Sequence, residues 1–173
     1  MLLSHFLSFY KGQSNEQSAR ECYLAVEHAL WEERILTPLT LIGALATVRV
    51  EVGKNYKPIR EFASGEAYEG RLDLGNTEPG DGIKYVGKGL IQLTGRANYA
   101  NYGKRLGVDL LGNPDLALDL KVSAKILAMY FKDRKVNVAC DAKDWEFARR
   151  KVNGGLNGYS EFIKVINQFL SKL

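Results

Sequence analysis

Glu51 is the acidic residue whose place in the chain best suits proton transfer. It falls in the last turn of a helix predicted over residues 38–52, with Thr37 as N-cap and Gly53 at its end. The unpaired carbonyl groups there carry a partial negative charge, which should raise the pKa of Glu51. A carboxylic acid that stays protonated near neutral pH can donate a proton to a leaving oxygen. A solvated glutamate balanced by nearby basic residues fits the position too: Arg49, Lys54 and Lys57.

Acid and base hydrolysis of this kind needs a second carboxylate, which activates water. The segment that follows Glu51 offers six: Glu61, Glu66, Glu69, Asp73, Glu78 and Asp81. Residue type alone does not choose among them, because an acidic residue in a loop is most often a solubilising surface charge.

The segment from Tyr85 to Tyr99 (YVGKGLIQLTGRANY) combines glycines with polar side chains. Its glycines allow the backbone to approach a ligand closely, and Gln92 and Asn98 each offer hydrogen-bond donors and acceptors. Thr94 can cap a helix and also hold a water molecule. A glycine-punctuated turn that leads into a core helix would explain the glycines and Thr94, but not the whole segment.

This segment strongly resembles the signature of glycoside hydrolase family 19, which comprises chitinases and related phage endolysins. Three further stretches resemble the family in the same order: residues 46–53, 68–82 and 152–155. The resemblance spans about residues 40–170 and implies a mainly α-helical, lysozyme-like domain over residues 1–173, with a long irregular loop lobe beside a substrate groove.

The resemblance also implies roles for individual residues. Glu51 takes the place of the family's catalytic acid, and Glu61 that of the water-activating base in the endolysin-like branch, with Glu69 as the alternative. Gln92 and Thr94 match positions that hold the attacking water, so Thr94 joins the catalytic set. Three residues match sugar-binding positions: Tyr85, Asn98 and Asn153.

Two positions depart from the family pattern. The usual histidine before the acid is Val50 here, so its role is missing or supplied by another residue. Lys164 stands where chitinases tend to have an arginine that supports the acidic pair, so the charge is kept and the bidentate guanidinium is lost. The family's mechanism is inverting, with two carboxyl groups about 6.5 to 9.5 Å apart.

The remaining pattern predicts the helices that would position these residues. Apolar residues at three- and four-residue spacing predict helices over residues 16–33 and about 122–130, another around 145–152 after an Asp141 cap, and one over 162–170. A short helix is expected over residues 94–106, and the apolar N-terminus is expected to form the first helix. Turn formers concentrate in residues 74–82, and a loop of that length is usually functional.

Composition limits the partners. The formal charge of +4 and pI near 9.0 favour an anionic partner, but the basic residues are scattered, so we expect no nucleic acid ligand. We expect buried free thiols at Cys22 and Cys140, and neither a metal site nor a cofactor, because His5 and His28 are isolated. No secretory signal and no stretch of bilayer-spanning length is recognised. A monomer held in the cytoplasm until it is released to the cell wall is therefore expected.

Three functions stay open at this stage. A basic protein is attracted more strongly to peptidoglycan, whose peptides are anionic, than to uncharged chitin. A lysozyme-type endolysin is therefore favoured over a chitinase. The third alternative is a catalytically inactive sugar-binding protein on the same scaffold, because fold does not fix function.

Overall fold

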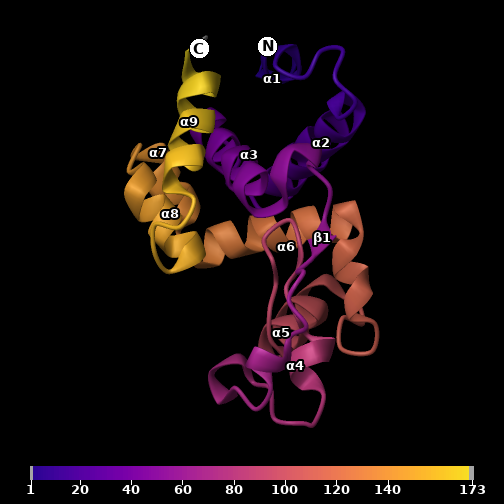
Figure 1. Ribbon diagram of the computed structural model, residues 1–173. Helices are drawn as coiled ribbons and strands as arrows, with labels where there is room; N and C mark the ends of the chain where they lie inside the picture. The colour runs from indigo at the N-terminus through magenta and orange to yellow at the C-terminus, as the bar shows by residue number, and fades with distance from the viewer. Residues whose placement is uncertain (1, 172–173) are drawn as a thin grey trace.

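The computed structural model describes residues 2–171, which are mainly α-helical, as predicted. Figure 1 shows a larger helical part and, below it, a smaller lobe. We call residues 59–106 the loop lobe. The N- and C-terminal ends of the described chain lie side by side at the far end of the helical part, where the rings of Phe6 and Phe169 are 5.3 Å apart.

The helical part consists of seven α-helices within the described residues. They are α1 (Leu2–Ser8), α2 (Glu16–Glu32), α3 (Pro38–Val52), α6 (Leu120–Asp133), α7 (Val136–Asp141), α8 (Trp145–Asn153) and α9 (Tyr159–Leu170). The short 3-10 helix η4 (Pro114–Leu118) leads into α6. In Figure 1 α6 crosses the molecule between α3 and the loop lobe.

α3 is the central helix, buried on almost all sides from Thr40 to Val48. A helix that is apolar all round belongs in a core. The Thr37 hydroxyl accepts a hydrogen bond from the N–H of Thr40, Pro38 occupies the first turn, and Gly53 ends the helix with φ 77°, as the sequence predicted. The last turn of α3 therefore presents Glu51 at the edge of the core, where its side chain is 16% exposed.

The loop lobe holds several short elements, and the sequence pattern predicted one of them, the helix near residues 94–106. They are β1 (Ile59–Arg60), η2 (Glu66–Tyr68), η3 (Leu72–Leu74), α4 (Asp81–Lys84), β2 (Lys88–Gly89) and α5 (Arg96–Leu106), and the 3-10 helix η1 (Gly53–Asn55) precedes the lobe. β1 pairs antiparallel with β2, Ile59 opposite Gly89. The expected helix over residues 94–106 thus begins at Arg96. Thr94 does not cap it: the N-cap is Gly95, and the Arg96 N–H donates to the Asn76 side chain at 2.8 Å.

One further cap differs from the prediction. Asp144, not Asp141, caps α8, accepting a hydrogen bond from the N–H of Phe147 at 3.0 Å. Asp141 instead ends α7 and accepts hydrogen bonds from the hydroxyls of Thr37 and Thr40 on α3. Asp141 thus belongs to the short helix α7, which was not predicted from the sequence.

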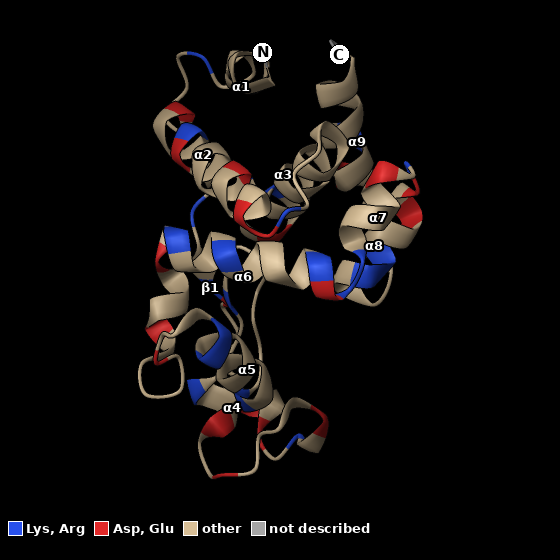
Figure 2. Ribbon diagram, turned by 180° about the vertical axis from the view of Figure 1, so that it is seen from behind, with Lys and Arg blue, Asp and Glu red and all other residues tan. Residues whose placement is uncertain are grey.

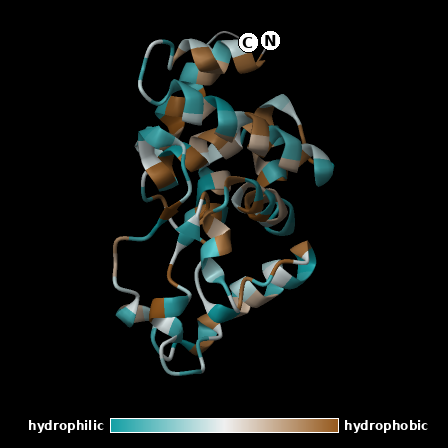
Figure 3. Ribbon diagram, turned by 90° about the vertical axis from the view of Figure 1, so that its right-hand side faces the viewer, coloured by the Kyte–Doolittle hydropathy of each residue, from teal (hydrophilic) through white to brown (hydrophobic). Residues whose placement is uncertain are grey.

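The surface agrees with the composition. Lys and Arg are spread over the helical part and the loop lobe with acidic residues between them (Figure 2). Hydrophobic segments run along the helices in the side view of Figure 3.

Cys22 and Cys140 are buried free thiols, as expected. None of the helices described is both long and apolar enough to cross a bilayer.

Candidate active site

Glu51 is held by an arginine from the other end of the chain. Arg149 Nη1 donates to Glu51 Oε1 at 2.7 Å, and Arg149 Nε donates to the carbonyl oxygen of Asn157 at 2.8 Å. The arginine is only 2% exposed. A buried guanidinium requires a partner, since an unpaired buried charge costs several kcal/mol. The hydrogen bond therefore fixes the position of the Glu51 carboxyl group.

Tyr130 supports the same corner of the molecule from α6. Its hydroxyl donates to the carbonyl of Val152 at 3.0 Å, at the end of α8. Burial raises the pKa of Tyr130, Arg134 acts to lower it, and the neighbouring charge of Glu51 adds to the rise. Tyr130 therefore stays a neutral donor and anchors the helix that carries Arg149.

Glu61 follows β1 directly and is fixed by three hydrogen bonds. Its backbone N–H donates to the carbonyl of Gly87 at 2.8 Å, which continues the β1–β2 pairing. Its Oε2 accepts from the Gly87 N–H at 3.2 Å, and its Oε1 accepts from the Tyr68 hydroxyl at 2.9 Å. Burial, followed by the hydrogen bond to Glu61, raises the pKa of Tyr68, so this phenol remains protonated and donating at neutral pH.

Three polar side chains meet over Gly87. A carbon added at its Cα would lie 2.8 Å from Glu61 Oε2, 3.0 Å from Gln92 Oε1 and 3.2 Å from Thr94 Oγ1. The missing side chain of Gly87 is therefore what allows the three oxygen atoms to converge. Sequence analysis named all three residues, and the structure brings them together.

Gln92 adopts a backbone conformation that is uncommon for a residue with a side chain. Its φ is 52°, in the left-handed region. Its Nε2 donates to the carbonyls of Ile59 and Gly89, at 3.1 and 2.9 Å, so the amide links the two strands and leaves Oε1 beside Gly87. Such strain, about 1–3 kcal/mol, is typical of functional sites.

Glu69, the alternative base, has a different set of contacts. Its Oε1 accepts from the Gly80 N–H at 2.6 Å and its Oε2 from the Gly82 N–H at 2.8 Å. Both oxygens therefore hold the backbone of the loop lobe. Arg71, two residues further along the chain, pairs with Asp73.

Comparisons with known proteins identify the family of the chain. The family model Glyco_hydro_19, described as "Chitinase class I", matches residues 53–169. The chain belongs to glycoside hydrolase family 19.

Individual relatives are similar over part of their length. A glycosyl hydrolase family 19 domain-containing protein of Haemophilus influenzae is 38% identical over 112 residues, 65% of this chain and 54% of that protein. Chitinase 8 of Oryza sativa is 36% identical over 78 residues, 44% of this chain and 28% of that protein. The chain thus spans about half the length of the first relative and less of the second.

Solved structures show the same fold. A bacterial family 19 chitinase, at 22% identity, superposes with a TM-score of 0.68 over 87% of this chain and 84% of that one. Chitinase C from Streptomyces griseus gives the same TM-score at 21% identity, over 86% of this chain and 67% of that one. The lysozyme-like helical fold expected of family 19 is therefore confirmed.

The predicted roles of Tyr85 in sugar binding and of Lys164 in supporting the acid are both wrong. Tyr85 is 1% exposed, and its hydroxyl donates to the carbonyl of Leu111 at 3.1 Å, so it is a core residue rather than a sugar contact. Lys164 is exposed on α9, and Arg149 supports the acid instead. The guanidinium is thus present, on another helix. The sequence did not indicate this role, because Arg149 lies within a basic run (Arg149, Arg150 and Lys151) that resembles a surface charge cluster.

The other two binding residues are placed as follows. Asn98 is half-buried, and its Nδ2 donates to the Thr94 carbonyl at 2.7 Å, so it stabilises the turn that carries Thr94. Asn153 is exposed at the last residue of α8, one turn after Arg149 and on the same face of the helix. Its sugar-binding role stays a prediction.

Val50 and Phe62 are sequence neighbours of the two candidate catalytic carboxyl groups. Val50 takes the place of the family's histidine and packs on Gly158, where an added carbon would be 2.6 Å from Val50 Cγ1. Phe62, next to Glu61, is fully exposed, which sequence analysis did not remark on. Among residues 2–171 no group of three or more His, Cys, Asp or Glu side chains is arranged to hold a metal ion.

Proposed function

We propose that this chain is a glycosidase that hydrolyses β-1,4 bonds of peptidoglycan by an inverting acid and base mechanism. Glu51 is the acid and Glu61 the base. The observation that carries the proposal is the convergence of Glu61, Gln92 and Thr94 over Gly87, because a carboxylate beside two further oxygen atoms is the arrangement that holds and activates one water.

Glu51 donates its proton to the glycosidic oxygen as the bond to the anomeric carbon breaks. The carboxylate that forms is then stabilised by the hydrogen bond from Arg149 Nη1. Glu61 removes a proton from the water that attacks the opposite face of the sugar ring. This mechanism inverts the anomeric centre and requires about 6.5 to 9.5 Å between the two carboxyl groups.

The preference for peptidoglycan rests on charge. The net charge of +4 attracts a polymer whose peptides carry carboxylates, and this attraction raises the local concentration of protein at the cell wall. Chitin is the second candidate, because relatives such as Chitinase 8 of Oryza sativa are named for it.

One experiment separates these functions. The protein is incubated with purified peptidoglycan and with chitin oligomers, and the new reducing end is identified. Muramic acid supports the lysozyme-type activity, N-acetylglucosamine released from chitin supports a chitinase, and no product from either supports a sugar-binding protein. Glu51→Gln is the control, and it should remain folded by circular dichroism and lose at least about 100-fold in turnover.

A further inference from the structure

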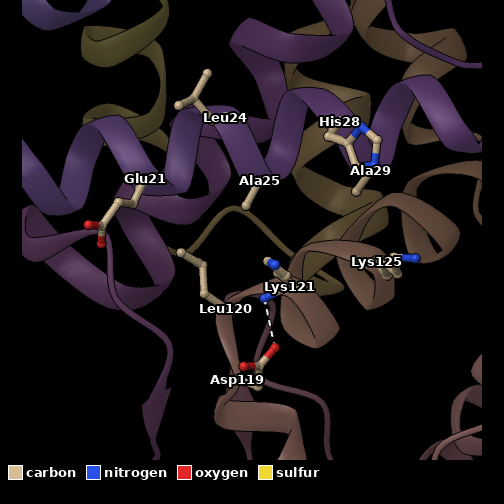
Figure 4. Close-up of a pocket in the computed structure, with 9 residues that line it drawn as sticks. All are labelled: Glu21, Leu24, Ala25, His28, Ala29, Asp119, Leu120, Lys121 and Lys125. Atoms are coloured by element: carbon tan, nitrogen blue, oxygen red, sulfur yellow. Dashed lines mark hydrogen bonds between the residues drawn. The ribbon is translucent and has the colours of Figure 1, made fainter.

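A hollow of about 610 Å³ lies between α2 and the start of α6, and it contains none of the site residues described above. Figure 4 shows Glu21 at one end, Lys125 and His28 at the other, and Ala25 and Leu120 between them. Nine residues line it: Glu21, Leu24, Ala25, His28, Ala29, Asp119, Leu120, Lys121 and Lys125. Its volume falls in the range of ligand pockets, about 300–1,000 Å³.

A second hollow of about 370 Å³ adjoins the first and shares Leu24 and His28 with it. Its other lining residues are Glu27, Trp31 and Leu36. Because α2 lines both, they form one continuous face, which we call the α2 surface.

Trp31 is the most exposed large hydrophobic side chain of the α2 surface. It is 64% exposed, although indole burial is among the larger hydrophobic gains available to a protein. Its ring stacks on His28, with centroids 5.8 Å apart and planes at 23°. The indole is thus oriented before any ligand arrives, which lowers the entropy cost of binding.

The charges of the α2 surface nearly cancel. Three acids, Glu21, Glu27 and Asp119, face two lysines, Lys121 and Lys125, and the latter is already paired with Glu32 at 3.1 Å. A surface of this kind does not favour an anionic ligand, whereas its carboxylates and ammonium groups can accept and donate hydrogen bonds to neutral hydroxyl and amide groups.

We propose that the α2 surface is a second binding site for the uncharged N-acetylglucosamine units of a glycan strand, separate from the catalytic residues. The Trp31 face covers the apolar C–H face of a sugar ring, and the polar residues of the adjoining hollow bind the hydroxyl and acetamido groups of neighbouring sugars. The inference rests on the substrate class proposed above. A second site on the same polymer raises the effective concentration of the substrate at the catalytic residues.

A protein partner fits these features less well. Stable protein interfaces bury about 800 Å² per partner over a core depleted in charge. The α2 surface instead consists of two concave hollows with charged side chains along their walls.

The first test measures binding without hydrolysis. In the Glu51→Gln background, the protein is mixed with insoluble chitin and with purified peptidoglycan, and the bound fraction is measured at increasing protein concentration. Trp31→Ala should weaken binding about tenfold, and Trp31→Tyr should keep most of it. The control is Val138→Ala, which shortens a 57% exposed side chain on α7, and it should bind as the parent does.

The second test observes the indole directly. The protein has two tryptophans, Trp31 and Trp145, so Trp145→Phe leaves Trp31 as the single indole emitter. Titration of this variant with a soluble N-acetylglucosamine hexamer should change the emission and saturate.

Three outcomes would overturn the proposal: equal binding by Trp31→Ala and Val138→Ala, no binding of the parent to either polymer, or an emission that does not respond. A fall in sedimentation mass on Trp31→Ala would also overturn it, because the surface would then join two copies of the chain. Failure of the proposed activity is a separate result, since it is recorded as the absence of new reducing ends from the enzyme with Glu51 intact.

Discussion

Arg149 Nη1 lies 2.7 Å from Glu51 Oε1, and this contact joins α8 to the end of α3 across 98 residues of sequence. Arg149 is among the largest fully buried side chains of the described chain. The acid is therefore positioned by a residue that belongs to the core, and the site depends on how α8 packs against α3.

Replacing Arg149 by lysine should lower kcat about 10- to 100-fold with a smaller change in KM. Lysine keeps the charge but cannot donate at once to Asn157 and Glu51 as the guanidinium does. A displacement of about 1 Å of a catalytic group is sufficient for such a loss. Steady-state kinetics together with a melting curve would test this.

Lys164→Ala is the matched control, because Lys164 is exposed on α9 and does not hold the acid. It should change kcat less than about twofold. A large loss for Lys164→Ala and a small one for Arg149→Lys would show that the supporting cation is Lys164 after all.

Gly87→Ala should reduce turnover at least tenfold while the protein stays folded. The added methyl group would lie within 3.2 Å of three oxygen atoms and displace the Glu61 carboxylate from the Gly87 N–H. Overpacking of this kind costs about 1–3 kcal/mol. The steric control is Gly155→Ala, whose methyl group meets nothing within 4 Å and should leave the melting temperature unchanged. Equal kinetics for Gly87→Ala and the parent would show that Gly87 does not shape the site.

The sequence predicted best where local signals decide the structure. The Thr37 cap, the Pro38 start and the Gly53 end of α3 are all encoded within a few residues, so the helix bearing Glu51 was predicted correctly. Glu61, Gln92 and Thr94 were found through a resemblance, and their convergence depends on the β1–β2 pairing, which local pattern did not reveal.

What the sequence did not reveal depends on tertiary packing. Tyr85 was expected to bind sugar, but its ring is buried beside Tyr99 at 5.3 Å. Arg149 was missed because burial of a polar or charged side chain has no local signature. Asn76 was missed for the same reason: it is fully buried and its side chain links the Tyr68 carbonyl to the Arg96 N–H.

Asp81→Asn should destabilise the protein by about 2–3 kcal/mol at pH 7. Asp81 Oδ2 accepts hydrogen bonds from the N–H groups of Thr77 and Glu78 and from Arg96 Nε. Burial acts to raise the pKa of Asp81, but the N–H of Glu78 and the guanidinium of Arg96 outweigh it, so the pKa is lowered. The ionised form is therefore the one that stabilises the fold.

The downward shift of the Asp81 pKa determines how the free energy of unfolding depends on pH. A carboxyl whose folded pKa is depressed contributes its stability above the unfolded value, here 3.8, and loses it as the pH falls through the folded pKa. The gap between the parent and Asp81→Asn in urea unfolding should therefore narrow below about pH 4. Asp73→Asn, which alters an exposed pair with Arg71, should show no comparable gap at pH 7. A gap that persists unchanged at low pH would mean that Asp81 acts through packing and not through its charge.

Mutation of the two candidate bases, Glu61 and Glu69, should affect turnover differently. Glu61→Gln should lower turnover at least about 100-fold, because the carboxylate that faces Gln92 and Thr94 can no longer accept a proton. Glu69→Gln should leave most of the activity and lower the melting temperature, because its carboxylate accepts the N–H groups of Gly80 and Gly82 and so holds the loop lobe. Kinetics at a temperature well below both melting transitions separate the two effects.

Azide provides the decisive comparison between the two carboxylates. It is a small anion that attacks the anomeric carbon without needing a base, so it should partly restore turnover in Glu61→Ala and yield a glycosyl azide. It should do nothing for Glu69→Ala, whose defect is the loss of two hydrogen bonds to the loop backbone. Rescue of Glu69→Ala without rescue of Glu61→Ala would reverse the assignment. Activation of the water would then lie deeper in the loop lobe, and Glu61 would serve to hold Tyr68 and Gly87 in place.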